Sequence, residues 1–234
     1  MAEMIALVGP PGRGKSTSIF PNEELNITGL DLKKTLIINV SGKSLSMRGW
    51  KKVFTDKPIK EGGNYIVSHD SELICNILKY IEKDRLDIEN IIIEDAQYLM
   101  GFAVMEKAKQ TGWDKWNIIG DIGFKPIDVA KDLKRDNLFI WFIYHEEKSD
   151  DGEVKIKTAG RMIDNTITLE GLFNTILFAN MEFDALTKKP NYFYITNADG
   201  KTKARSKYGT FKSLRIPNDL GLVKEAIRQY NIGE

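Results

Sequence analysis

The sequence predicts an α/β fold in which a mainly parallel central sheet is flanked by helices and extended by C-terminal β-hairpins and a closing helix. Short, continuously apolar segments alternate with amphipathic segments, which is typical of parallel strands joined by crossover helices. A glycine-rich loop follows the first apolar segment. Beyond His145 the pattern changes to short alternating segments separated by turn residues, which indicates hairpins.

Five apolar segments are expected to form the core strands: residues 4–8, 35–40, 64–68, 90–94 and 138–145. Residues 72–83 predict an amphipathic helix with Asp70 or Ser71 as its N-cap. Its apolar face would hold Leu73, Ile74, Ile77, Leu78 and Ile81. Residues 96–135 are expected to be mostly helical and broken near the middle by Gly120, Gly123 and Pro126.

The C-terminal part is expected to extend the same domain. Residues 154–158, 175–179 and 192–196 predict strands, and turn signals lie at residues 150–152 and 199–200. A closing amphipathic helix is expected over residues 217–230. Residues 1–147 therefore form the expected core, and residues 148–234 its β-rich extension.

Composition excludes several classes of protein. Of 234 residues, 42% are hydrophobic, which is enough for a sizeable core, and the net charge of +1 excludes a generally basic nucleic-acid coat. No apolar run approaches the ~20 residues that cross a bilayer. With Cys75 as the lone cysteine and only two histidines, an internal disulfide and a Cys- or His-rich metal site are excluded. We expect a soluble cytoplasmic protein without a signal peptide or membrane partner.

The glycine-rich loop matches the phosphate-binding pattern G-x-x-x-x-G-K-[S/T] at every fixed position. It consists of Gly9, Pro10, Pro11, Gly12, Arg13, Gly14, Lys15 and Ser16, followed by Thr17. Its backbone N–H groups, and those of the helix expected after it, would cradle phosphates. Lys15 would reach the β- and γ-phosphates, and Ser16 would coordinate Mg²⁺. The expected ligands are therefore ATP and Mg²⁺; the alternative is a chance glycine-rich turn.

Acidic residues follow the fourth apolar segment. Glu94 takes the usual metal-side position and Asp95 the usual water-side position, although the two roles could be exchanged. The alternative is that these acids only start the next helix. His145 and Glu146 end the fifth apolar segment, where they could act as catalytic sensors of the γ-phosphate or simply form a solvated strand end.

Two basic segments are candidate partner surfaces. Lys201, Lys203, Arg205 and Lys207 alternate, which would place them on one face of a strand. They could contact single-stranded DNA, reach a neighbouring subunit's ATP, or form a solvated hairpin face.

Trp113 and Trp116, near Lys109 and Lys115, could stack on bases or pack internally. The cations Lys148, Lys155, Lys157 and Arg161 around the 150–152 turn allow the same DNA-contact and solvated-face interpretations.

Several motifs together resemble a family of short phage RecA-like ATPases, which are single-strand annealing and recombination proteins of the phage nucleotide-binding AAA-type P-loop group. The motifs are the phosphate-binding loop and residues 39–50, 91–100, 144–147 and 216–220. The resemblance implies a RecA-like P-loop NTPase core, DNA loops near residues 101–116 and 147–161, and assembly into rings or filaments. Glu94 stands where those relatives usually carry Asp.

The expected function is that of a Mg²⁺-dependent, DNA-stimulated ATPase which binds single-stranded DNA and promotes annealing or strand pairing as an oligomer. A single-strand-binding protein is a candidate further partner. One alternative is a P-loop kinase acting on a nucleotide or another small molecule. Another is a nucleotide-dependent accessory protein of DNA packaging or replication.

Overall fold

The computed structural model describes residues 1–149, 152–159 and 168–233. Of the segments singled out above, Asp150, Asp151 and Arg161 lie outside the described residues. None of the described helices is both long enough and apolar enough to cross a membrane.

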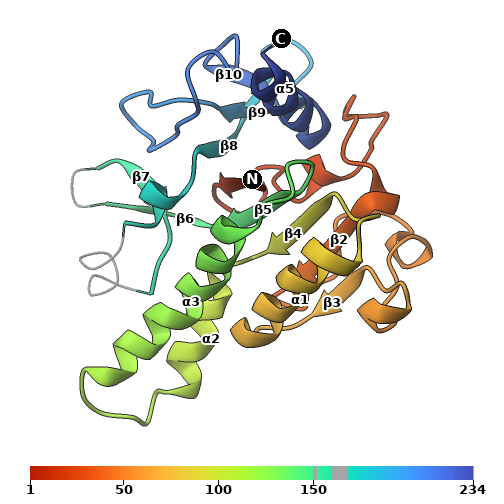
Figure 1. Cartoon of the computed structure of the whole chain (residues 1–234). Helices are drawn as coiled ribbons and strands as arrows, with labels where there is room; N and C mark the ends of the chain where they lie inside the picture. The colour runs from red at the N-terminus through yellow and green to blue at the C-terminus, as the bar shows by residue number, and fades with distance from the viewer. Residues whose placement is uncertain (150–151, 160–167, 234) are drawn as a thin grey trace.

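An eight-stranded sheet forms the centre of the molecule, and the strand order along it is β10-β9-β8-β1-β5-β4-β2-β3 (Figure 1). Its strands are β1 (Glu3–Val8), β2 (Thr35–Asn39), β3 (Tyr65–Val67), β4 (Asn90–Glu94), β5 (Phe139–Tyr144), β8 (Thr175–Phe183), β9 (Pro190–Ile195) and β10 (Arg215–Pro217). All pairs from β8 to β3 are parallel, whereas β8, β9 and β10 pair antiparallel. The five predicted core strands are confirmed, with ends shifted by a residue or two.

The sheet order places β5 between β1 and β4. Because the strands from β8 to β3 are parallel, the loops after β1, β2, β4 and β5 all leave the same edge of the sheet. This is the mainly parallel α/β arrangement that the sequence predicts, with antiparallel strands and a closing helix added at the C-terminal side.

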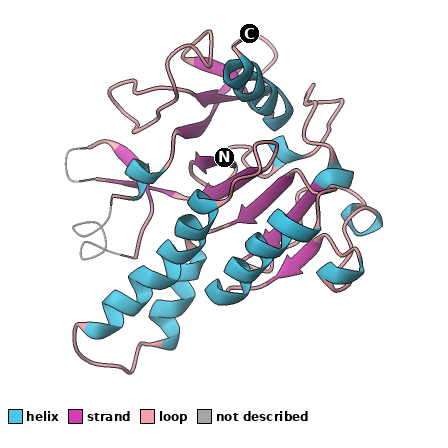
Figure 2. Cartoon of the chain, viewed as in Figure 1, coloured by secondary structure: helices cyan, strands magenta, loops and turns pink. Residues whose placement is uncertain are grey.

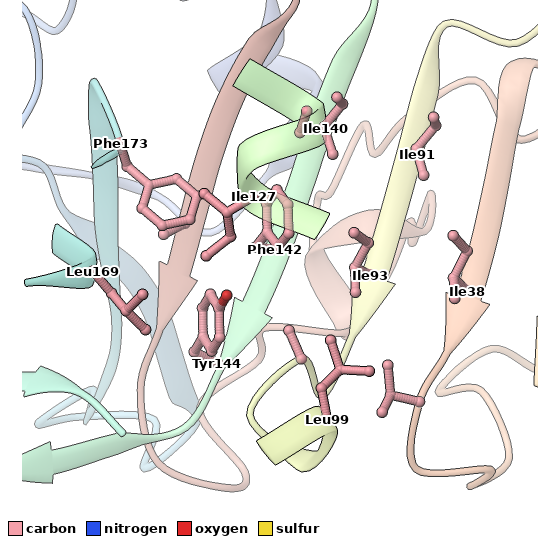
Figure 3. Packing of buried hydrophobic residues seen from close by; sticks show 14 of the residues in the cluster. Ile38, Ile91, Ile93, Leu99, Ile127, Ile140, Phe142, Tyr144, Leu169 and Phe173 are labelled. Atoms are coloured by element: carbon pink, nitrogen blue, oxygen red, sulfur yellow. The ribbon is translucent and has the colours of Figure 1, made fainter. Parts of the chain in front are cut away.

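Hydrophobic layers cover both faces of the sheet. Figure 2 shows the helices that lie beside its strands. On one face α1 (Ser71–Asp84), α2 (Tyr98–Glu106) and α3 (Asp114–Asp132) pack on the strands. Figure 3 shows part of that layer, with Leu99 and Ile127 against Ile93 and Phe142. The other face is covered by α5 (Leu220–Ile232) and by chain segments between β1 and β3. Burial on both faces explains why the central strands are apolar along their whole length.

Helix α1 agrees with the prediction except at one position. Asp70 is the N-cap, because its carboxylate accepts hydrogen bonds from the backbone N–H groups of Glu72 and Leu73. Leu73, expected on the apolar face, is 43% exposed, whereas Cys75 is buried there. The other predicted residues of this face, Ile74, Ile77, Leu78 and Ile81, are buried, so the prediction fails only at Leu73.

The predicted break within residues 96–135 was placed wrongly. The helices separate between residues 106 and 114, where Gly112 has a φ of 91°, and α3 continues through Gly120, Gly123 and Pro126. Gly123 serves packing, since a Cβ at this position would lie 2.5 Å from Met100 Cγ of α2. Contact between two helices therefore overrides the local helix-breaking tendency of these residues.

The predicted C-terminal strands are present, and the closing helix begins at Leu220, three residues after the predicted start. Strand β7 (Val154–Ile156) instead pairs with β6 (Glu146–Lys148) in a separate two-stranded sheet. Residues 201–207 do not form the predicted strand. They make isolated bridges to Val154 and Ile176, and Ala204 is buried, so the segment is held as an irregular edge segment.

Candidate active site

The phosphate-binding loop follows β1 at the edge where the parallel strands end. Gly12 and Gly14 have φ values of 76° and 81°, which only glycine adopts without strain. Lys15 is buried, and its Nζ donates hydrogen bonds to the carbonyl oxygens of Gly9 at 2.6 Å and Pro10 at 2.9 Å. Burial lowers the pKa of Lys15 to about 8, although Glu94 and Asp95 oppose the shift.

The helix expected after the loop is replaced by a single 3₁₀ turn, Thr17–Ile19. Pro21 explains the early end, because a proline disfavours helical geometry in the preceding residue, and Phe20 is extended. The prediction that a helix N-terminus assists phosphate binding is therefore wrong. Phosphate recognition would depend on the loop amides and on Lys15.

The C-terminal strands brace the loop from behind. A Cβ on Gly14 would lie 3.1 Å from Asn218 Oδ1 and 3.1 Å from Tyr192 Cδ1. The Asn218 side-chain amide donates to the Arg13 carbonyl oxygen at 3.4 Å. The hydroxyls of Ser18 and Tyr194 lie 2.6 Å apart, and Ser18 Oγ also donates to the Lys15 carbonyl oxygen at 2.6 Å. These contacts hold the loop in position. No α-helix follows the loop to do so.

The first acid of the pair after β4 contacts the loop directly. Ser16 Oγ donates a hydrogen bond to Glu94 Oε1, whereas the buried Glu94 Oε2 has no hydrogen-bond partner. Burial raises the pKa of Glu94 to about 7, and the nearby Asp95 charge adds to the shift. An unpaired carboxylate oxygen beside a serine hydroxyl is a strong candidate for cation binding.

Asp95 has different surroundings from its neighbour. Its φ of 60° is unusual for a residue other than glycine, and a hydrogen bond of 2.8 Å from Ala96 N to Ile143 O holds the turn. Its Oδ1 lies 3.3 Å from His145 Nε2 and 3.5 Å from Gln97 Nε2, and its Oδ2 lies 3.1 Å from Lys43 Nζ. Although burial opposes the shift, hydrogen bonds from His145, Ser41 and Lys43 and the Lys43 charge hold the pKa of Asp95 well below its usual range.

A cavity of about 360 Å³ joins these groups. It is lined by residues 11–17 of the loop, by Glu94, Asp95, Tyr98 and His145, and by residues after β2. The wall after β2 includes Ser41, Lys43 and Leu45, which sequence reasoning did not assign to the site. The available signal was the polar Ser-Gly-Lys-Ser segment directly after an apolar strand, because strand ends of a parallel sheet share one edge.

Three other predicted site residues, Gly9, Pro10 and Glu146, do not line the cavity. Gly9 and Pro10 contribute the carbonyl oxygens that hold Lys15. Glu146 begins β6 and does not line the cavity, and burial raises its pKa while the Lys15 and Arg13 charges oppose the shift.

The basic segment is outside the cavity as well. Lys201, Lys203, Arg205 and Lys207 are all absent from its lining. Lys207 pairs with Glu3 at 3.4 Å, at the end of β1 opposite the phosphate-binding loop. Lys203 Nζ lies 3.9 Å from a carboxylate oxygen of Glu153. Lys207 therefore cannot reach the nucleotide site of its own chain.

No family model and no curated protein matches this chain. Among solved structures, a KaiC-like protein from the hyperthermophilic archaeon Pyrococcus horikoshii OT3 is similar, with a TM-score of 0.43 and 10% sequence identity. The matched region covers 88% of this chain and 82% of that protein. The assignment of the fold rests on the sheet order and on the position of the phosphate-binding loop within it.

The residues present fit a magnesium ion that is bound together with phosphates. Within the described parts of the chain, no group of three or more His, Cys, Asp and Glu side chains gathers as a self-sufficient metal site. Mg²⁺ typically takes one or two protein ligands and completes its shell with phosphate oxygens and water. Ser16 Oγ and the unpaired Glu94 Oε2 match this requirement.

Proposed function

We propose that this protein is a Mg²⁺-dependent ATPase that binds single-stranded DNA and promotes annealing or strand pairing as an oligomer. The observation that supports the enzymatic part most strongly is the direct Ser16–Glu94 contact beside the phosphate-binding loop. The contact places Glu94 beside Ser16 of the loop that would hold the phosphates. The two side chains that would share Mg²⁺ are therefore adjacent to the phosphate site. Bound Mg²⁺ would neutralise charge on the β- and γ-phosphates.

The chain's own residues would perform the remaining steps. Lys15 would leave the carbonyl oxygens of Gly9 and Pro10 and bind the terminal phosphates. Asp95 would orient a water molecule whose oxygen attacks the γ-phosphorus, and the water proton would leave with the phosphate product. The bond between that phosphorus and the β–γ bridging oxygen then breaks, which yields ADP and inorganic phosphate. Positioning and charge stabilisation would supply most of the rate enhancement.

The DNA part of the proposal is supported by the far end of the α2–α3 hairpin, which extends away from the sheet (Figure 1). Trp113 and Met105 are 74% and 73% exposed there. Lys109 and Lys115 lie in the same segment, so an aromatic ring and cations are available together. Stacking on bases and pairing with phosphates require this combination. Trp116, by contrast, packs against the hydrophobic core.

The 201–207 segment would serve the same partner or a neighbouring subunit. Lys207 lies at the opposite end of β1 from the phosphate-binding loop of its own chain. Any contact of Lys207 with ATP would therefore be with ATP bound to a second copy of the chain in a ring or filament. Its neighbour Tyr208 is fully exposed and would add a stacking surface.

The decisive experiment measures ATP hydrolysis with and without single-stranded DNA on size-fractionated protein. We expect Lys15→Met to lower the rate at least 100-fold, since its charge cannot be replaced by the loop amides. Trp113→Ala is expected to reduce DNA stimulation, whereas Phe183→Ala, at an exposed aromatic residue elsewhere, leaves it unchanged. Transfer of the γ-phosphate to a small molecule rather than to water would instead indicate a kinase.

A further inference from the structure

Four side-chain donors surround the Asp95 carboxylate in the nucleotide-free arrangement. Its Oδ1 faces the side-chain nitrogens of His145 and Gln97, its Oδ2 faces Lys43 Nζ at 3.1 Å, and the Ser41 hydroxyl also donates to the carboxylate. Because a carboxylate has about four acceptor sites, a water molecule would compete with one of these donors. His145 is held in turn, because its backbone N–H donates to Gln97 Oε1 at 3.1 Å. Of these partners, Lys43 has the longest side chain, and it is 62% exposed. Oδ2 is therefore the oxygen that can be released most easily.

The backbone under Lys43 is fixed, although its side chain extends into solvent. The buried Asn39 at the end of β2 accepts a hydrogen bond from Gly42 N at 2.9 Å and donates to the Lys43 carbonyl oxygen at 2.6 Å. The same amide donates to the Tyr65 hydroxyl at 2.9 Å, which anchors it to β3. Gly42 takes a φ of 73°, as this tight turn requires. The turn presents the Lys43 stem to the cavity from a rigid base.

Lys43 and the phosphate-binding loop line the same cavity. Residues 11–17 of the loop contribute to its lining, as do Ser41, Lys43 and Leu45 after β2. The Lys43 ammonium lies 5.3 Å from the centre of the Tyr98 ring, so two contacts guide it towards Asp95. A triphosphate bound to the loop would bring negative charge into the space between Lys15 and Lys43, and both cations would be attracted to it.

We infer that Lys43 is a γ-phosphate-binding residue that moves from Asp95 to the terminal phosphate when a nucleoside triphosphate binds. This inference rests on the proposed nucleotide-binding function. The exchange couples two events. The terminal phosphate gains a second cation in addition to Lys15, and the Asp95 carboxylate gains an acceptor site that can hold the attacking water. A diphosphate has no terminal group in that position, so it leaves the Lys43–Asp95 pair intact.

The inference predicts discrimination between triphosphate and diphosphate, which equilibrium binding measures without catalysis. Calorimetric titrations with Mg²⁺ and either AMP-PNP or ADP would compare wild type, Lys43→Met, Lys43→Arg and Lys57→Met. Lys43→Met should weaken AMP-PNP binding about tenfold or more and change ADP binding less than about twofold. Lys43→Arg should retain most of the discrimination, because it keeps the charge. Lys57, an exposed lysine outside the cavity, is the control and should have no effect.

A second variant tests the exchange itself. Asp95→Asn removes the partner that Lys43 must leave, so AMP-PNP should bind several-fold more tightly, and this gain should shrink in the Lys43→Met background. Equal weakening of both nucleotides by Lys43→Met, or no effect on either, would overturn the inference while the proposed function stands. If the wild type bound neither nucleotide, the proposed function and the inference would fail together.

Discussion

Two adjacent carboxylates at the end of β4 have pKa values that their surroundings shift in opposite directions. Glu94 is buried with one unpaired oxygen and has a pKa of about 7, whereas cationic and hydrogen-bonding partners hold the pKa of Asp95 far below that value. Environments that separate two carboxyl pKa values in this way are typical of acid–base and metal chemistry. Glu94 would lose its proton on binding Mg²⁺, so Mg²⁺ affinity should fall as pH decreases below 7.

Glu94→Gln should stabilise the metal-free protein while it abolishes Mg²⁺-dependent hydrolysis. Because the folded-state pKa of about 7 exceeds the reference value of 4.5, the stability that the protonated side chain provides is complete below pH 4.5 and is lost as pH rises through 7. A permanently neutral Gln avoids that loss, which amounts to roughly 3 kcal/mol above pH 7. Urea unfolding at pH 5 and pH 8 measures it.

The stabilisation should be larger at pH 8 than at pH 5. A variant that is destabilised equally at both pH values would show that Glu94 is ionised and well satisfied in the free protein. Retained hydrolysis at the wild-type rate would remove Glu94 from the metal site.

At the scale of elements, the sequence predicted strands better than helix boundaries. Continuous apolar runs such as residues 90–94 and 139–144 can be satisfied only by burial on both faces, so their pattern is decisive. The 3₁₀ turn after the phosphate-binding loop has a local signal in Pro21, which the prediction of a helix overlooked, and its position is fixed by the contact of Ser18 with Tyr194, which is 176 residues away. The uninterrupted α3 depends on a tertiary contact, because Gly123 packs on Met100.

Gly123→Ala should destabilise the protein, although alanine favours helices. The new Cβ would lie 2.5 Å from Met100 Cγ and 2.8 Å from its sulfur, so either the buried Met100 side chain must leave its packed position or α2 and α3 must move apart. We expect a cost of about 1–2 kcal/mol after the gain in helix propensity. Gly101→Ala in α2 is the matched control, because its Cβ would meet only Tyr98 Cδ1 at an ordinary 3.5 Å, and it should stabilise by about 0.5–1 kcal/mol. Equal effects of the two substitutions in urea unfolding would contradict the packing explanation.

At the scale of the whole molecule, strands β8, β9 and β10 of the C-terminal extension belong to the central sheet and support the candidate site. Strand β8 pairs with β1 directly, and the segments around Tyr194 and Asn218 contact the phosphate-binding loop and its exit. Sequence reasoning located the loop and the acids after β4, because each is a local pattern. It did not assign the wall after β2, since only the assembled sheet shows that residues 41–45 face the loop.

Asp219→Ala should be strongly destabilising because one buried carboxylate joins two distant segments. It accepts hydrogen bonds from the backbone N–H groups of Thr28 at 2.6 Å and Gly29 at 2.9 Å, and it caps α5 through Gly221 and Leu222. We expect a loss of about 2–4 kcal/mol, measured by denaturant unfolding. Asp184→Ala, which removes a similar but exposed turn carboxylate, should cost less than about 1 kcal/mol. A similar cost for both would show that Asp219 has no special connecting role.

The central claim, that residues 9–17 and Glu94 form a Mg²⁺–triphosphate site, is tested most directly by a crystal structure with Mg²⁺ and AMP-PNP. The expected result has Lys15 Nζ moved from the Gly9 and Pro10 carbonyl oxygens to the terminal phosphates, with Mg²⁺ held by Ser16 and Glu94. A complex in which Lys15 still bonds to those carbonyl oxygens and the nucleotide lies elsewhere would contradict the claim.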